Sequence, residues 1–400
     1  MTELRGWWLR HGRAVLLLAV ASMAVAAVWR IGNELPALIL ETGGYGAFDL
    51  QLWHRGVQRW FAGLAVYGEV ERGDYPPASY VLLWPLLGWL ELAPARLLWA
   101  ITALGALAWF AVIAVRESTA NTRLQVIMIG LLPFSTYGTA AALRLGQIGN
   151  HVLPMLAAGL LLLYRGRGRL RDDLLAAALL LPVLVKPTLT AAFFWIVCFV
   201  PGRIRPIALI TSGYLALTLF ALRFQPVPLA ERLFGWVGEP PQVLQGHANI
   251  QKWLALVGLE AWMMPATVAL LAALAIWVYR HRTADPWILI GVSALVARLF
   301  IHHRLYDDML ILLPMIALFR IARHGARPDD SDVRAGLLFA AAWITVHAPA
   351  RWLQSPLSGP LLEAVQSVVW IVALGFLVRR ARESARGSAA PEAAQSPAAA

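Results

Sequence analysis

Charged residues are scarce in this sequence. Only 14% of its 400 residues are Asp, Glu, Lys or Arg, whereas 59% are hydrophobic. Soluble domains carry about 25% charged residues and about half apolar ones, so this composition excludes an ordinary soluble domain. Apolar runs close to the roughly 20 residues that cross a bilayer recur along most of the chain. The sequence therefore predicts an all-α, polytopic bundle of transmembrane helices.

Cysteine and lysine are almost absent. The single cysteine, Cys198, lies in an apolar run and has no partner for an intrachain disulfide. Lysine occurs only at positions 186 and 252, while arginine supplies all the other cationic side chains. Lys186 and Lys252 are therefore unusual within the residue usage of this chain.

The features of a nucleic-acid-binding protein are also missing. The formal net charge is +11, but the positive residues are scattered between apolar segments and form no basic stripe with interleaved aromatic residues. No glycine-rich phosphate loop or nucleotide-binding motif is present in the sequence. We interpret the charge as a determinant of membrane topology and predict no nucleic-acid partner.

The apolar runs predict one integral-membrane domain over 1–382 and a disordered cytoplasmic tail over 383–400, which is rich in Ala, Pro and Ser. The N-terminus, with arginines before an apolar run, resembles a signal peptide, but we interpret it as an uncleaved first helix. The predicted spans number about twelve: 14–33, 97–115, 124–142, 152–164, 174–186, 188–200, 207–222, 253–279, 286–301, 305–320, 335–350 and 364–378.

The apolar run 78–92 determines the predicted topology. If it lies on the outer face or dips into it without crossing, most arginines fall in segments on one side of the membrane, as the positive-inside rule requires. Both termini then face the cytoplasm, and 34–96 and 223–252 become large outer loops. Within the first loop, Leu50, Trp53, Val57 and Trp60 share one helical face. This pattern predicts an amphipathic helix in the interface, with its tryptophans at headgroup depth.

Residues 174–200 are predicted to form a helical hairpin. Pro187 argues against one continuous helix, since proline removes a hydrogen bond and biases the preceding residue away from helical geometry. Arginine-rich segments on both sides, at 165–171 and 203–205, also require an even number of crossings between them. Lys186 is then expected near the outer tip of the hairpin.

With this topology the distinctive polar residues of the sequence gather at the outer face. An apolar bowl rimmed by carboxylates and cations suits a substrate that has a lipid tail and a phosphate head. The residues concerned are Asp49, Asp74, Tyr75, Arg144, Gln147, Asn150, His151, Lys186, His247, Asn249, Lys252, His302, His303, Arg304, Tyr306, Asp307 and Asp308.

Asp49, Lys186 and the pair of His303 and Asp307 each admit two interpretations. Asp49 opens the amphipathic helix, so it is either a helix cap or a catalytic group. Lys186 either binds a phosphate or extends to lipid headgroups. His303 and Asp307 are four residues apart, so the carboxylate either orients the imidazole or contributes half of a metal site, for which two ligands are weak evidence. We predict no cofactor or protein metal ligand and leave a divalent metal open.

Several short motifs, taken in order, resemble glycosyltransferase family 87 of the GT-C membrane glycosyltransferases, the mannosyltransferases that use polyprenol-phosphate mannose. They extend from about residue 40 to residue 320. The motifs are Phe48-Asp49-Leu50, Val66-Tyr67-Gly68, Asp74-Tyr75-Pro76-Pro77, Leu145-Gly146-Gln147-Ile148-Gly149-Asn150, Lys186-Pro187-Thr188, and His302-His303 with Tyr306 before Leu312-Leu313-Pro314. The sequence departs from the family pattern at Arg298-Leu299-Phe300-Ile301, which precedes the histidines.

The resemblance implies a GT-C fold and an inverting enzyme of a bacterial plasma membrane. It would move a hexose, mannose in this family, from a polyprenyl-phosphate donor to a glycolipid or glycan acceptor on the non-cytoplasmic face. Asp49 would be the general base, with His302 or His303 as its polar partner. The expected substrate-binding residues are Lys186, Arg304, Tyr75, Gln147, Asn150, Tyr306 and Asp74.

Two other classes of protein fit parts of the pattern. A lipid flippase or transporter would place ionisable residues near the bilayer midplane and often shows inverted repeats. A glycan ligase or polymerase with a pyrophosphate-linked donor would depend on arginines and a histidine without needing a carboxylate base. Sugar, linkage and oligomeric state are left open by the sequence.

Overall fold

The protein is an assembly of helices. The computed structural model describes residues 2–41, 45–67, 75–226, 228, 230, 246–324, 330–348, 355 and 358–393, and these contain no strand, which confirms the all-α prediction. The α-helices that frame the molecule are α1 (Thr2–Leu40), α2 (Phe48–Phe61), α3 (Pro77–Leu87), α4 (Leu92–Glu117), α5 (Arg123–Ser135), α6 (Tyr137–Leu145), α7 (Gly149–Arg165), α8 (Leu170–Leu180), α11 (Arg205–Ala221), α14 (Met263–Arg280), α15 (Pro286–Phe300), α16 (Leu312–His324), α17 (Asp330–His347) and α19 (Gly359–Ala393).

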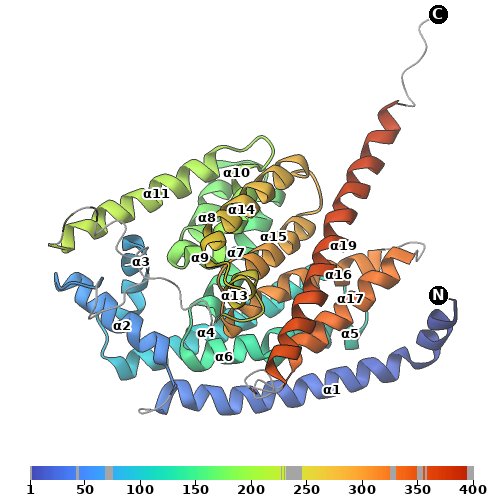
Figure 1. Cartoon of the computed structure of the whole chain (residues 1–400), viewed down its shortest axis with the longest axis horizontal. Helices are drawn as coiled ribbons and strands as arrows, with labels where there is room; N and C mark the ends of the chain where they lie inside the picture. Colours follow the sequence, from blue (N-terminus) through green and yellow to red (C-terminus); the bar gives the residue numbers. More distant parts are fainter. Residues whose placement is uncertain are drawn as a thin grey trace, which may run out of the picture.

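Short elements connect these helices. They include η1 (Pro182–Val185), α9 (Pro187–Thr190), η2 (Ala191–Phe193), α10 (Phe194–Cys198), η3 (Leu222–Phe224), α13 (Ile250–Leu256), η6 (Glu260–Trp262) and η7 (Leu305–Ile311). Figure 1 shows α1 along the lower edge of the molecule, α11 along the upper left, and α7, α14 and α15 between them.

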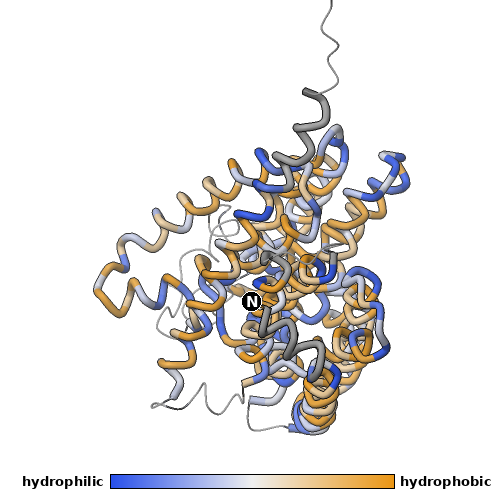
Figure 2. Tube along the Cα trace, turned by 90° about the vertical axis from the view of Figure 1, so that its right-hand side faces the viewer, coloured by the Kyte–Doolittle hydropathy of each residue, from blue (hydrophilic) through white to orange (hydrophobic). Residues whose placement is uncertain are grey.

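Five helices in the described residues are long and apolar enough to cross a membrane: His11–Leu40, Leu92–Glu117, Arg205–Phe224, Glu260–Arg280 and Gly359–Glu383. The pair α5 and α6, bent by 40°, adds a sixth if it forms one span. Figure 2 shows how continuous the apolar residues are along these helices. Transmembrane helices are thus present, whereas the count of about twelve stays a prediction, because several predicted spans fall on shorter or broken helices.

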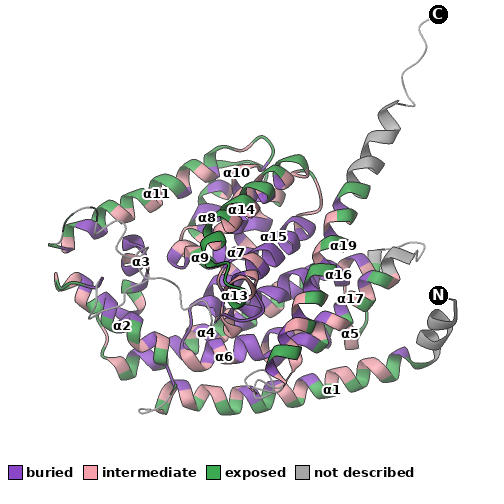
Figure 3. Cartoon of the chain, viewed as in Figure 1, coloured by how far each residue is buried: buried purple, intermediate pink, exposed green. Residues whose placement is uncertain are grey.

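The outer helices expose apolar side chains. Val28, Trp29 and Ile101 are 74%, 64% and 61% exposed, and Val268 and Val368 are each 60% exposed. In Figure 3 exposed residues recur along α1, α11, α14 and α19, while α15 is buried along most of its length. Since water would not tolerate so much exposed apolar surface, these faces suit the hydrocarbon region of a bilayer.

The predicted amphipathic helix is α2, and its tryptophans are buried in the protein. Trp53 is 5% exposed and Trp60 is fully buried. The Trp60 ring stacks on Tyr80 of α3, with centroids 4.4 Å apart, and its Nε1 donates to the carbonyl of Ala221 at 3.0 Å. The apolar face of α2 thus packs on α3 and on the end of α11 instead of on lipid, while the depth of the tryptophans in the membrane stays a prediction.

The chain breaks where the hairpin was predicted to turn. Residues 170–198 form α8, η1, α9, η2 and α10, and Lys186 separates η1 from α9 with φ −127° and ψ 81°. Pro187 is the first residue of α9, a position where its missing N–H costs nothing. Lys186 is only 9% exposed, so it is buried at this break and is not extended toward headgroups.

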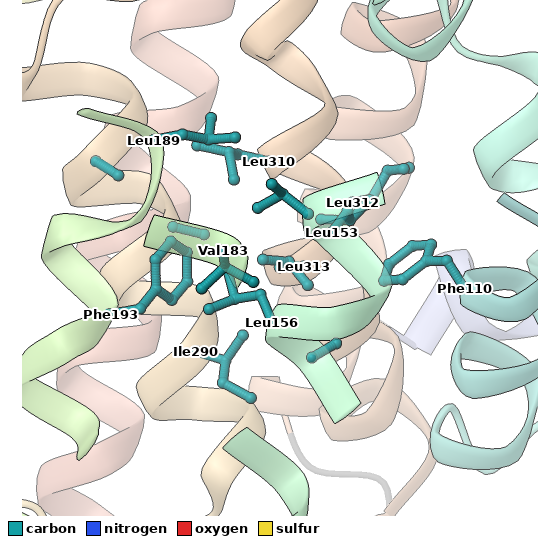
Figure 4. Packing of buried hydrophobic residues seen from close by; sticks show 14 of the residues in the cluster. Phe110, Leu153, Leu156, Val183, Leu189, Phe193, Ile290, Leu310, Leu312 and Leu313 are labelled. Carbon is teal, nitrogen blue, oxygen red and sulfur yellow. The ribbon is translucent and has the colours of Figure 1, made fainter. Parts of the chain in front are cut away.

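A continuous apolar core surrounds this break. Figure 4 shows Leu153 and Leu156 of α7 beside Leu312 and Leu313 of α16. Leu189 and Leu310, in the same view, each lie three residues after a charged residue of the candidate site. Protein interiors are close-packed, so the contacts of these leucines fix the backbone that carries the site.

The C-terminal helix differs from its predicted end. α19 continues to Ala393, past the predicted start of the tail at 383, and residues 394–400 lie outside the described part of the chain. The predicted run 78–92 contains α3, which at 11 residues is too short to cross alone. Most of the second outer loop, 223–252, also lies outside the described residues.

Candidate active site

Asp49 is the second residue of α2 and not its cap. The N-cap position belongs to Ala47, which has a positive φ of 55° and makes no side-chain capping hydrogen bond. The preceding turn is held by Arg96, which donates to the carbonyls of Glu41 at 2.8 Å and Gly46 at 3.1 Å. The carboxylate of Asp49 accepts from Nε2 of Gln147 at 2.6 Å. The cap interpretation therefore fails, and Asp49 faces the rest of the candidate site.

Gly146 allows Gln147 to come this close. It ends α6 with φ 72°, a conformation that L side chains rarely adopt. A Cβ at this position would lie 2.5 Å from the Cβ of Leu50, the residue after Asp49. The glycine thus permits both the turn after α6 and the contact between this turn and α2.

Gln147 links Asp49 to a buried ion pair. Its Oε1 accepts from Nζ of Lys186 at 3.4 Å, and the same ammonium lies 3.0 Å from Oδ1 of Asp307. The Lys186 and Asp307 side chains are 11% and 4% exposed. A buried charge needs a partner, and the partner of Lys186 is a carboxylate instead of a lipid headgroup.

Asp307 also orients His303. Its Oδ2 lies 3.1 Å from Nδ1 of His303 and accepts from the backbone N–H of Arg304 at 3.2 Å. The predicted pairing of the two residues is confirmed, although they are not on one α-helical face: His303 precedes η7, and Asp307 lies in its first turn. With Nδ1 donating to Asp307, the neutral imidazole carries its lone pair on Nε2.

Five side chains therefore form one connected set, which we call the site network: Asp49, Gln147, Lys186, Asp307 and His303. They come from α2, the turn between α6 and α7, the break before α9, and the residues around the start of η7. Both ends of the network are groups that can accept a proton, and its centre is a cation. Such an arrangement suits acid–base chemistry next to a negatively charged ligand.

The two histidines are kept neutral by their surroundings. Burial, with smaller contributions from His303 and Arg304, lowers the pKa of His302 to about 4. Burial also lowers the pKa of His303, and Asp307 only partly opposes this effect. Nδ1 of His302 and Nε2 of His303 are buried without a hydrogen-bond partner among the described residues. Neutral imidazoles with open nitrogens can bind the hydroxyl groups of a ligand.

An apolar cavity adjoins the site network at Lys186. Its volume is about 520 Å³, within the range of small-molecule sites. It lies among α3, α9 and α11, and its wall includes Leu184, two residues before the lysine, and Pro187, directly after it. The lining residues are Pro76, Pro77, Leu184, Pro187, Phe194, Ile210, Thr211, Tyr214, Leu215 and Thr218.

The remaining predicted residues are distributed around this centre. The Tyr306 ring lies 4.9 Å from the ammonium of Lys186. Tyr75 packs edge-on against Trp53, with centroids 5.2 Å apart. The backbone N–H of Arg304 donates to the carboxylate of Asp307 in the network. Asn150 is fully buried and donates to the Thr139 carbonyl at 3.2 Å instead of to the network. Asp74 lies outside the described residues.

A second set of buried polar side chains lies next to the site network. The sequence did not predict that these residues form one set. Asp308 accepts from Arg298 and from the hydroxyl of Tyr137 and lies 3.4 Å from Nε2 of His247. Nδ1 of His247 lies 3.1 Å from Glu363 of α19, which also pairs with Lys252 at 2.7 Å. The sequence could have indicated Arg298 and Glu363 as buried polar residues, because both are charged residues beside or within apolar runs.

This second set supports the position of His303. The backbone N–H of His247 donates to the His303 carbonyl at 2.9 Å, and Nδ2 of Asn249 donates to the same oxygen at 3.1 Å. The segment around His247 therefore contacts the segment around His302, as predicted. His151 lies elsewhere, 2.9 Å from the Thr102 hydroxyl.

No metal site is formed by the described part of the chain, where no group of three or more His, Cys, Asp or Glu side chains could hold an ion. The pair His303 and Asp307 gains Lys186 as its neighbour, and a cation is a poor neighbour for a metal.

Comparison with known protein families gives one match. The model of glycosyltransferase family 87 matches residues 74–302, more than half of the chain. The comparison with curated proteins found no match, and neither did the comparison with solved structures.

Proposed function

Since the chain belongs to glycosyltransferase family 87 and is thus a membrane glycosyltransferase, we propose that it transfers a hexose from a polyprenyl-phosphate donor to a glycolipid or glycan acceptor. Mannose is the proposed sugar, and the non-cytoplasmic side of a bacterial plasma membrane is the proposed location. The GT-C fold and the roles of the site residues below belong to the same proposal.

One observation carries this proposal. The buried ammonium of Lys186 pairs with Asp307, and the chain beside this lysine contributes Leu184 and Pro187 to the wall of an apolar cavity of about 520 Å³. A polyprenyl phosphate has the matching chemistry, an apolar chain next to an anionic head. A nucleotide sugar would place a polar base and ribose where this cavity offers mainly apolar groups.

The proposed reaction needs a base at Asp49. The carboxylate takes the proton of an acceptor hydroxyl while the hydroxyl oxygen forms a bond to the anomeric carbon. The bond from that carbon to the phosphate oxygen breaks on the opposite side, so the configuration inverts and the electron pair leaves with polyprenyl phosphate. The neutral amide of Gln147, at 2.6 Å, holds the carboxylate without neutralising it.

The leaving phosphate needs cations. An ammonium has three N–H donors, and Lys186 uses two of them for Asp307 and Gln147. The third is proposed to bind a phosphate oxygen, with Arg304 supplying a second positive charge. His302, half-buried and neutral, is proposed to bind a sugar hydroxyl.

Transfer of radiolabel tests the proposal. Purified enzyme in detergent is incubated with a membrane lipid extract and labelled polyprenyl-phosphate mannose, and parallel reactions contain labelled nucleotide sugars. Label should pass to a lipid or glycan product only from the polyprenyl donor. Transfer from a nucleotide sugar alone would overturn the proposed donor class.

The flippase alternative is less favoured by the same geometry. A transporter needs ionisable groups that line a path through the membrane, whereas those of the described site network gather in one cluster. Label that changes leaflet without a new glycosidic bond would support the transporter.

A further inference from the structure

A second cavity lies between α14 and α19. Its volume is about 490 Å³, and it is lined by Ala273, Ile276, Trp277, Arg280, His281 and Arg382. The first three residues form an apolar wall along α14, and the last three place nitrogen-bearing side chains at one end. No carboxylate contributes to its lining.

The two arginines of this cavity have no carboxylate partner among the described residues. Among the described residues neither Arg280 nor Arg382 makes an ion pair, although Arg379 and Arg380 on the same helix both pair with Glu383. Both free arginines are exposed. Two guanidinium groups at the open end of an apolar cavity form a binding site for an anion that carries an apolar chain.

The Trp277 side chain adds a sign of the membrane interface. Its ring stacks on the His281 ring at 4.8 Å with an interplanar angle of 23°, and Nδ1 of His281 bonds to the Trp277 carbonyl at 2.8 Å. Trp277 Nε1 is buried without a partner among the described residues. Arg280 is the last residue of the apolar helix α14, and tryptophan is enriched at headgroup depth, so this end of the helix suits the headgroup layer.

This cavity is separate from the candidate active site. α14 ends at Arg280, and α15 then runs from Pro286 to Phe300, two residues before His302. Fifteen helical residues span about 22 Å. The polar end of the second cavity and the site network therefore lie near opposite ends of α15.

We infer that the cavity between α14 and α19 binds an anionic phospholipid. Its phosphate diester would contact Arg280 and Arg382, and one acyl chain would lie along Ala273, Ile276 and Trp277. Basic pockets between transmembrane helices bind anionic headgroups in this way. A zwitterionic lipid would bring its own cation to the two guanidinium groups and bind more weakly.

Native mass spectrometry of the full-length protein in detergent tests this inference with phosphatidylglycerol, phosphatidylcholine and inorganic phosphate as probes. Phosphatidylglycerol should bind in preference to phosphatidylcholine. The double variant Arg280→Gln with Arg382→Gln should weaken that binding roughly 30-fold, at about fivefold per arginine. The control Arg169→Gln with Arg171→Gln removes two exposed arginines outside the cavity and should bind like wild type.

A second variant, which blocks the cavity and keeps both arginines, keeps the test decisive if the double variant misfolds. Ile276→Trp fills the apolar wall and leaves both arginines in place, and because Ile276 is 55% exposed the fold should tolerate the change. This variant should also lose phosphatidylglycerol. Equal binding of both lipids, equal loss in the control variant, or displacement of the lipid by inorganic phosphate at comparable concentration would each overturn the inference.

Discussion

Asp49 illustrates what a single residue type can and cannot indicate. Its position at the start of a helix suggested a cap, yet the cap position is Ala47 and the carboxylate accepts from Gln147. Sequence position could suggest that Asp49 mattered, because a carboxylate beside apolar residues is costly. It could not identify Gln147 as the partner, since that contact joins residues 98 positions apart.

Asp49→Asn tests the proposed base. Asparagine has nearly the same shape and can still accept from Gln147, but it cannot take a proton, so turnover should fall by about 10² to 10⁴. Steady-state kinetics with the labelled donor would measure this, with melting temperature as the check on folding. The control Asp172→Asn makes the same change in the first turn of α8 and should leave turnover unchanged. Near-normal turnover in Asp49→Asn would make Asp74 the next residue to test.

Lys186 combines a structural and a proposed chemical role, which two variants can separate. Lys186→Met leaves Asp307 without its cation in a buried site, so the free energy of unfolding should fall by about 3–5 kcal/mol. Adding Asp307→Asn removes the unpaired charge and should restore much of the stability without restoring turnover. Chemical denaturation and the transfer assay measure the two effects. Recovery of turnover in the double variant would exclude a role for Lys186 at the phosphate.

The neutral histidines predict a pH dependence. The pKa of His302 is lowered to about 4 in the folded protein, whereas an unfolded histidine has a pKa of about 6.5. Between these values the unfolded state binds more protons, so this contribution to stability is present above about pH 6.5 and is lost as the pH falls toward 4. His302→Gln should therefore melt with a smaller change between pH 7 and pH 5 than wild type. An identical pH dependence of the melting temperature would contradict this.

At the scale of elements, periodicity and proline positions were informative, whereas contacts between elements were not. The break at Pro187 and the helix at α2 could be predicted, because both are local consequences of backbone geometry and side-chain alternation. The environment of the tryptophans could not be predicted, because lipid and protein are both apolar and a pattern of apolar residues does not distinguish them. The buried set of Arg298, Asp308 and Glu363 likewise depends on contacts between distant segments.

At the scale of elements, the testable prediction is that the cavity beside α11 holds the lipid chain of the donor. Leu215 lines the cavity and is 55% exposed, so Leu215→Trp should narrow the cavity without disturbing the core. The KM for a long-chain polyprenyl donor should rise, while a short-chain donor analogue should be less affected. Leu219→Trp makes the same change one turn later, at a residue that is 56% exposed and does not line the cavity. Equal effects of both variants on both donors would show that the cavity does not hold the donor chain.

For the whole molecule, composition was sufficient for the class of protein and insufficient for its path through the membrane. The scarcity of charge indicated a helical membrane protein, and the described helices agree. Five or six of them are long enough to cross, and shorter apolar helices such as α3 and α15 can be buried by their neighbours or can enter the membrane only in part. Helix length alone cannot decide between these arrangements, because the surroundings of a short helix depend on tertiary packing.

The topology is testable with single cysteines in a Cys198→Ala background, in which no other thiol is present. We predict that 78–92 does not cross, so Arg55, exposed on α2, and Arg169, exposed before α8, lie on opposite sides of the membrane. A membrane-impermeant maleimide applied to intact cells should label Arg55→Cys and should label Arg169→Cys only after the cells are opened. If 78–92 crossed, every segment after it would invert and Arg169→Cys would react from outside. Labelling of both positions in intact cells would therefore overturn the predicted topology and, with it, the placement of Lys186 and His302 on the non-cytoplasmic side.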